Sequence, residues 1–140
     1  MPDFDIGLQH RVKRLVQQTA DQHRHLGALR REVDAAFEHG AVQDAANAMR
    51  RFEVALAAHF ELEQGFFFPA LHGLSPARST ELEALENEHA GFLGELRTLE
   101  ARVEQVSAQA SRDALAAWFV GLREHEDREE RLVALISNHP

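Results

Sequence analysis

Two places in the sequence pair a histidine with a glutamate four residues later. His59 is followed by Glu63, and His125 is followed by Glu129. Residues i and i+4 lie on one face of a helix, one turn apart, so each pair can offer an imidazole nitrogen and a carboxylate oxygen to a single ion. Such mixed ligands suit iron, manganese or zinc better than calcium or magnesium. The spacing therefore predicts metal binding, although each pair alone is a weak motif.

These residues also belong to an internal repeat. An offset of 66 residues separates the members of three pairs, namely His23 and His89, His59 and His125, and Glu63 and Glu129. Apolar positions follow the same offset, for example Phe52 and Trp118. The two halves of the chain are therefore similar to two copies of one helical hairpin, which predicts pseudo-two-fold symmetry.

The elements that must position these residues are helices. Between breaks that contain glycine, proline or serine, the sequence is rich in Ala, Leu, Glu and Arg, which favour helices, and no run alternates with period two. Short links between helices favour antiparallel neighbours, and the length suits one domain. The expected fold is all-α, an up-down-up-down antiparallel four-helix bundle that forms a single domain over residues 1–140. We predict its helices over residues of about 5–38, 41–71, 76–106 and 109–137.

Each predicted helix has an apolar seam with alternating spacings of three and four, and a histidine interrupts every seam. The distances of these histidines from the loops place all four in one layer of the core. A buried polar group without a partner costs about 1–3 kcal/mol, and a bare carboxylate costs more. Metal cations would offset that cost. The candidate metal ligands are His23, His59, Glu63, His89, His125 and Glu129.

The overall composition excludes several classes of function. The formal net charge of −8 argues against binding to phosphate backbones. Cysteine is absent, so neither disulfides nor thiolate ligands are available. No apolar stretch is long enough to span a membrane, and the N-terminal residues do not resemble a signal peptide. We therefore expect a cytoplasmic protein that binds neither nucleic acid nor membrane.

Two of the six candidate positions have competitors nearby. His25 lies two residues after His23, but it is off the seam and breaks the repeat. Glu130 lies five residues after His125, whereas the repeat favours Glu129. The sequence leaves both alternatives open. The other histidines are expected to be exposed, and they are His10, His39, His72 and His139.

The sequence fits two known classes of di-iron protein poorly. Glu86 and His89 form a Glu-x-x-His motif, which is typical of ferritin-like di-iron sites, but such a site needs two of these motifs and the sequence contains no second one. Tyrosine is absent, which excludes an enzyme that uses a tyrosyl radical.

The combination of motifs resembles the hemerythrin-like, or HHE cation-binding, domain family. That family is a four-helix bundle with His on helix 1, His-x-x-x-Glu on helix 2, His on helix 3, and His-x-x-x-Glu or His-x-x-x-x-Asp on helix 4. The matching residues here are His23, His59 with Glu63, His89, and His125 with Glu129. The stretch from His59 to Leu71 also resembles the family's second helix, which often ends in an aromatic residue followed by Pro-x-Leu.

The resemblance implies a cofactor as well as a fold. It covers nearly the whole chain and implies two iron ions, a non-haem di-iron centre in which two carboxylates and an oxo or hydroxo group bridge the irons. Manganese or zinc can substitute for iron in such a site. Hemerythrin proper has a fifth His on helix 3, one turn from the other, whereas Leu85 and Leu93 occupy those positions around His89. With four His, each iron would keep an open position.

We therefore expect a protein that binds or reacts with a small ligand, namely O2, NO or peroxide, rather than a simple oxygen carrier. Alternatives compatible with the same residues are iron sensing or storage, iron donation for the repair of other proteins, and a redox enzyme of the peroxidase type. A bundle that only pairs with another protein is a further alternative. The sequence leaves open whether the protein is an enzyme, and it is compatible with a homodimer.

Overall fold

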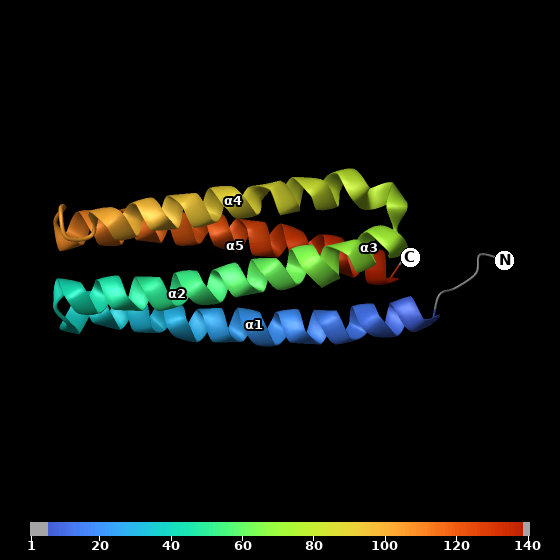
Figure 1. Ribbon diagram of the computed structural model, residues 1–140, viewed down its shortest axis with the longest axis horizontal. Helices are drawn as coiled ribbons and strands as arrows, with labels where there is room; N and C mark the ends of the chain where they lie inside the picture. Colours follow the sequence, from blue (N-terminus) through green and yellow to red (C-terminus); the bar gives the residue numbers. More distant parts are fainter. Residues whose placement is uncertain (1–5, 139–140) are drawn as a thin grey trace.

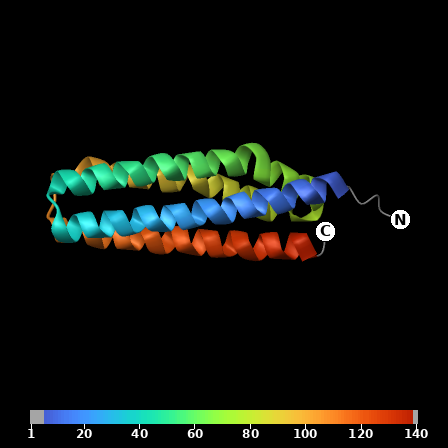
Figure 2. The same cartoon turned by 90° about the horizontal axis from the view of Figure 1, so that it is seen from below.

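The computed structural model describes residues 6–138, and these residues are helical along nearly their whole length. The long helices lie side by side as a helical bundle, and both described ends of the chain lie at the same end of the bundle (Figure 1 and Figure 2). No strand is present between residues 6 and 138, and none of the helices in this range carries an apolar stretch of the kind that crosses a bilayer. The helices are α1 (Ile6–His39), α2 (Val42–Leu62), α3 (Phe68–Leu74), α4 (Ser79–Arg102) and α5 (Ala108–Asn138).

The link between α1 and α2 is as short as the sequence predicts. The α1 helix ends at His39, and Gly40 follows it in a position where an added Cβ would lie 2.9 Å from the carbonyl oxygen of Ala36. Glycine fits this close approach of the backbone because it has no Cβ. The carboxylate of Asp44 accepts a hydrogen bond from the backbone N–H of Ala41 at 2.9 Å, which helps the next helix to begin.

The second predicted helix is interrupted by a π-helical turn, η1 (Glu63–Phe67). Here the backbone N–H of Phe68 donates to the carbonyl of Glu63, five residues earlier. A π turn contains more residues than an α turn, so it shifts every later side chain around the helix axis. The spacing of three and four that defines the predicted seam runs through His59, Glu63 and Phe66, but Phe66 is 64% exposed and Phe67 is buried instead. The prediction for Phe66 was wrong because a regular α-helix was assumed.

The third predicted helix is shorter than expected. It begins with a 3₁₀ turn, η2 (Pro76–Arg78), continues as α4, and ends at Arg102 rather than near residue 106. The hydroxyl of Ser107 then accepts a hydrogen bond from the backbone N–H of Ala110 at 3.1 Å. This is the interaction that serine makes before the start of a helix, and it places the start of α5 at Ala108.

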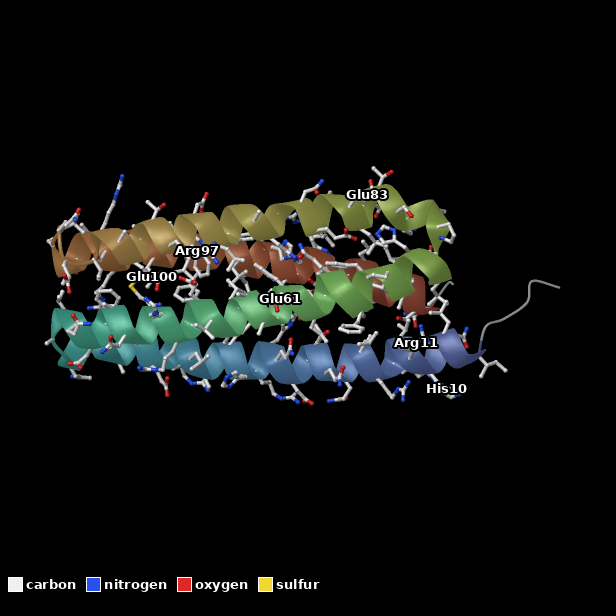
Figure 3. All side chains as sticks on the ribbon, in the orientation of Figure 1. His10, Arg11, Glu61, Glu83, Arg97 and Glu100 are labelled. Carbon is white, nitrogen blue, oxygen red and sulfur yellow. The ribbon has the colours of Figure 1, made fainter. Side chains whose placement is uncertain are left out.

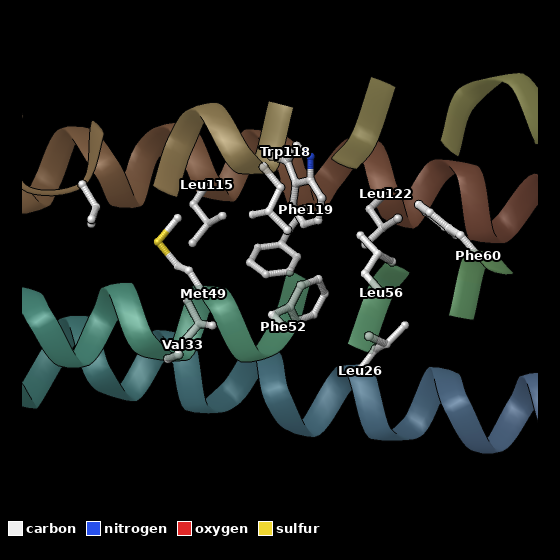
Figure 4. Packing of buried hydrophobic residues seen from close by; sticks show 13 residues of the cluster. Leu26, Val33, Met49, Phe52, Leu56, Phe60, Leu115, Trp118, Phe119 and Leu122 are labelled. Atoms are coloured by element: carbon white, nitrogen blue, oxygen red, sulfur yellow. The ribbon is translucent and has the colours of Figure 1, made fainter. Parts of the chain in front are cut away.

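Two apolar clusters fill the interior. The first includes Phe52, whose ring packs edge-on against Trp118 and Phe119 at centroid distances of 5.7 and 5.1 Å (Figure 4). The second lies toward the other end of the bundle and includes Phe67 and Leu82. Along every long helix, most of the buried polar residues lie between the residues of the first cluster and those of the second. The clusters therefore hold a polar layer in the middle of an apolar core.

A carboxylate pair joins α2 to α4 on the surface of the first cluster, in the region where Figure 3 labels Arg97 and Glu100. Burial and the neighbouring Glu53 raise the pKa of Glu100 to about 8, while the hydrogen bond from Glu100 lowers the pKa of Glu53. The guanidinium of Arg97 donates to Glu53 at 3.4 Å. Of the two carboxyl groups, Glu100 is therefore the one whose pKa is raised and Glu53 the one whose pKa is lowered.

Replacing Glu100 with Gln tests this arrangement. Between pH 4.5 and about 8 the folded protein keeps a proton on Glu100 that the unfolded chain has released, so the free energy of unfolding falls as pH rises through this window. The melting temperature of Glu100→Gln should therefore match wild type near pH 4.5 and exceed it increasingly up to pH 8. The exposed Glu95 supplies the control variant Glu95→Gln. A difference in melting temperature that does not change with pH would contradict the assignment.

Candidate metal centre

All six predicted ligand positions lie at one level of the bundle interior and come from every long helix. His59 and His125 on α2 and α5, His89 on α4, and the carboxylates Glu63 and Glu129 are each almost fully buried. His23 on α1 is the most accessible member, with 13% of its side chain exposed. These six residues form the candidate metal centre, here called the centre, and they are His23, His59, Glu63, His89, His125 and Glu129.

Short distances divide the centre into two overlapping groups. In the first, ligand atoms of Glu63, His89, His125 and Glu129 all lie within 4.8 Å of one another, and in the second those of His23, His59 and Glu129 do. Glu129 belongs to both groups. The half of the centre with His89 and His125 is called the α4–α5 half, and the half with His23 and His59 is called the α1–α2 half.

Glu63 also lies between the two halves. Its Oε1 is 3.2 Å from Nε2 of His59 and 3.4 Å from Nε2 of His89. Nε2 of His23 lies 3.2 Å from Nε2 of His59. The arrangement therefore points four imidazoles toward a common space, with one carboxylate from α5 and one from the π turn beside them.

Most of these atoms have no hydrogen-bond partner within residues 6–138. The unpartnered atoms are both carboxylate oxygens of Glu63, both ring nitrogens of His89, Nε2 of His125 and Oε2 of Glu129. Buried polar atoms normally have partners, and each exception costs about 1–3 kcal/mol. A set of nitrogen and oxygen lone pairs at this spacing fits metal cations, which would supply the missing interactions. The residues present therefore fit the metal that the sequence predicts.

The electrostatics of the centre favour neutral groups when no cation is considered. Burial raises the pKa of Glu63 to about 7 and that of Glu129 well above its ordinary value, where the neighbouring Glu63 adds to the effect. Burial lowers the pKa of His89 to about 3, helped by His125, and that of His23 to about 4, helped by His59. The imidazoles are thus held neutral, as metal ligands must be, while the carboxylates would lose protons on binding a cation.

Two side chains outside the centre orient its histidines. Nδ1 of His59 lies 2.6 Å from Oε1 of Gln22, and Nδ1 of His125 lies 2.7 Å from Oε1 of Glu88. With the proton on Nδ1, each ring donates to that oxygen and keeps Nε2 free for a metal, which is a common arrangement around metal-binding histidines. Arg128 donates to both oxygens of Glu88 at 2.8 and 2.6 Å. Sequence reasoning missed all three residues, although Gln22 and Glu88 each directly precede a seam histidine.

The two competing residues, His25 and Glu130, are exposed and not buried in the interior. The side chain of His25 is exposed. Glu130 is 65% exposed, and its Oε1 lies 3.5 Å from Nδ1 of His23, on the side of the ring away from His59. His10 and His39 are exposed as expected, and His139 lies outside the described residues.

His72 differs from the expectation of an exposed residue. Its ring is half-buried and makes hydrogen bonds with the hydroxyl of Ser79 at 2.9 Å and the carboxylate of Glu86 at 2.8 Å. These bonds join α3 to α4 at the corner of the bundle. Glu86 is therefore occupied at this corner and lies outside the two ligand groups, so its Glu-x-x-His motif with His89 does not act as a ferritin-like pair.

A cavity of about 390 Å³ lies between α1 and α5 and reaches the α1–α2 half of the centre. The two helices lie side by side in Figure 2. The lining of this cavity combines His23, Glu129 and Thr19 with apolar side chains, among them Phe67 and Val133. The hydroxyl of Thr19 is buried and has no hydrogen-bond partner in the described part of the chain. A small molecule can therefore approach the centre along a mainly apolar wall.

Glu63→Gln distinguishes the destabilisation that the buried carboxylate causes in the metal-free protein from its contribution to metal binding. The folded-state pKa of about 7 lies above the ordinary 4.5, so ionisation of Glu63 lowers the stability of the metal-free protein as pH rises through that window. At pH 8 the variant should melt at a higher temperature than wild type in the presence of chelator. It should also gain less on anaerobic addition of ferrous ions, because one ligand is weakened.

The matched control for this measurement is Glu61→Gln, which changes an exposed glutamate two residues earlier (Figure 3). It should leave both melting temperatures near those of wild type. A Glu63→Gln protein that melts lower than wild type without metal, and gains as much as wild type with metal, would show that Glu63 is an ordinary structural residue.

Comparison with known proteins gives one finding. Residues 14–135 match the family model described as Hemerythrin HHE cation binding domain, and this segment contains the whole centre. The searches of curated proteins and of solved structures gave no match to the chain. The matched segment covers most of the sequence, and the buried histidine and glutamate side chains fit a metal site. The chain belongs to the hemerythrin HHE cation-binding domain family.

Proposed function

We propose that the six residues of the centre hold two iron ions, with Glu63 and Glu129 shared between them, and that the protein binds or reacts with O2, NO or peroxide there. The observation that carries this proposal is the set of buried ligand atoms that lie close together and lack a hydrogen-bond partner in residues 6–138. Glu129 belongs to both ligand groups, and Glu63 lies within 3.4 Å of a histidine from each half. Manganese or zinc are the substitutes that the same ligands allow.

When bound, a pair of ferrous ions would supply the electrons and exchangeable positions that reaction with O2, NO or peroxide requires. The chain provides the surroundings. Phe60 stacks on the ring of His89 at a centroid distance of 3.8 Å, and Phe92 packs edge-on against His125 at 5.2 Å. These aromatic rings exclude water from the α4–α5 half. The α1–α2 half, by contrast, borders the cavity between α1 and α5, where Thr19 can donate a hydrogen bond to a small polar ligand.

The absence of a fifth histidine supports reaction rather than storage of a gas. Leu85 is buried in the second apolar cluster, and Leu93 packs against the first. Neither position offers a donor atom, so the protein supplies four imidazoles and two carboxylates. Positions on the ions that the protein does not fill are open to exogenous ligands.

We also propose the finer architecture and setting. The chain is one domain with up-down-up-down topology, built from two hairpins related by the 66-residue offset. The placement of His23 and His89 in one centre supports this relation. We propose that the protein acts in the cytoplasm, and the acidic composition supports a protein that binds neither nucleic acid nor membrane.

Metal content tests the ligand assignment. Protein purified from iron-supplied cells should contain about two iron ions per chain, the stoichiometry expected when two carboxylates bridge a metal pair. Glu129→Ala should lose most of both ions, because Glu129 belongs to both ligand groups. His23→Ala should lower metal affinity, whereas His25→Ala should not, since His25 is exposed. Elemental analysis and chelator competition measure both effects, with Glu86→Ala as a control.

The assignment would be wrong if Glu129→Ala retained two ions, or if His25→Ala lost more metal than His23→Ala. In the second case α1 would present a different face to the centre, and the 66-residue repeat would have pointed to the wrong histidine.

Reactivity is tested by exposing the diferrous protein repeatedly to O2 and then to argon. We expect progressive net oxidation, seen as a ferric absorption spectrum that argon does not reverse. The physical reason is that open positions on both ions allow a ligand to react, whereas a fifth imidazole would fill one of them. The spectrum should also shift on addition of azide. An oxygenated spectrum that forms and fades over many cycles, without net oxidation, would contradict the open-site argument.

A further inference from the structure

Each half of the centre has one histidine that is held from outside by the neighbouring helix. Gln22 on α1 accepts from His59 on α2, and Glu88 on α4 accepts from His125 on α5. Gln22 and Glu88 lie 66 residues apart, the offset that also relates the histidines of the centre. The two side chains therefore accept the same hydrogen bond at equivalent positions of the repeat, but one is a neutral amide and the other a carboxylic acid.

The acid is held in its charged form. Arg128 donates to both oxygens of Glu88 at 2.6 and 2.8 Å, which is the paired geometry that guanidinium groups make with carboxylates. The position 66 residues before Arg128 is Leu62, which cannot pair with an anion. A hydrogen bond to an ionised acceptor is roughly twice as strong as one between neutral groups. The ring of His125 is consequently more electron-rich than that of His59.

The other two histidines do not cancel this difference. Nδ1 of His89 is buried and has no hydrogen-bond partner in the described residues, and its ring stacks on Phe60. Nδ1 of His23 faces Glu130, but the separation is 3.5 Å and Glu130 is 65% exposed, so water and salt screen that interaction. The strongest polarisation of any imidazole in the centre is thus the one that Glu88 exerts on His125.

We propose that Glu88 and Gln22 are positioning residues that make the two halves of the centre unequal, so that the α4–α5 half binds the first metal ion more tightly and the α1–α2 half binds the second more weakly. This inference rests on the proposed function. The burial of the ligands acts in the same direction, because both histidines of the α4–α5 half are almost fully buried, whereas the side chain of His23 in the α1–α2 half is 13% exposed. The contribution of the two acceptors is therefore isolated by changing them alone.

The test is an anaerobic titration of the metal-free protein with ferrous ions in competition with a chelator. Wild type should bind in two resolved steps, and His23→Ala should keep the tighter one. Glu88→Gln preserves the shape and the hydrogen bond but removes the charge, so it should weaken the tighter step by about 10–100-fold. Gln22→Glu should instead strengthen the weaker step, a gain that a merely structural role would not produce.

Glu83→Gln is the matched control, because it removes the charge of an exposed glutamate on the same helix. It should leave the tighter step as strong as in wild type. If Glu83→Gln weakened that step as much as Glu88→Gln, the loss would come from the net charge of the protein and not from the acceptor of His125. If wild type bound two ions tightly and neither Glu88→Gln nor Gln22→Glu changed their affinities, this inference would be wrong while the proposed function would stand. A wild-type chain that binds no ferrous ion would overturn the proposed function and this inference with it.

Discussion

The structure depends on one unfavourable condition, which is the burial of two carboxylates and three imidazoles in the middle of an apolar bundle. Six of their polar atoms lack partners in residues 6–138, at a cost of about 1–3 kcal/mol each. A typical domain has about 5–15 kcal/mol of net stability. The apolar clusters on either side must therefore stabilise the fold enough to tolerate this layer. Cations bound by the layer would turn the same atoms into a stabilising feature.

Several local features follow from this condition. The π turn begins at Glu63 and shifts the side chains that follow it around the helix axis, and Phe67 and Phe68 are buried in the second cluster. Gln22 and Glu88 fix the rings of two histidines from outside the layer. The cavity between α1 and α5 leaves one route by which a small molecule reaches the centre. Support from outside on both halves, and access on one of them, are thus built into the same bundle.

The sequence predicts the bundle and the composition of the centre because both depend on regular spacing. A histidine at an apolar seam position, and a glutamate one turn later, can be recognised without coordinates. The exposure of Phe66 could not be predicted, because the spacing of a seam assumes a regular α-helix and the π turn from Glu63 to Phe67 departs from that geometry. Gln22, Glu88 and Arg128 were missed because they act across helices, and seam positions do not identify such contacts. His72 was missed for the same reason, since Ser79 and Glu86 reach it from another helix.

Above all, we propose that the centre holds two metal ions between the four long helices. The most direct test of this proposal is a crystal structure of the iron-loaded protein with anomalous diffraction measured on both sides of the iron absorption edge. We predict two iron peaks inside the bundle, each within bonding distance of two of the four histidines, with Glu63 and Glu129 contacting both. A single peak, or iron found only at surface residues such as His25 or His39, would contradict the account.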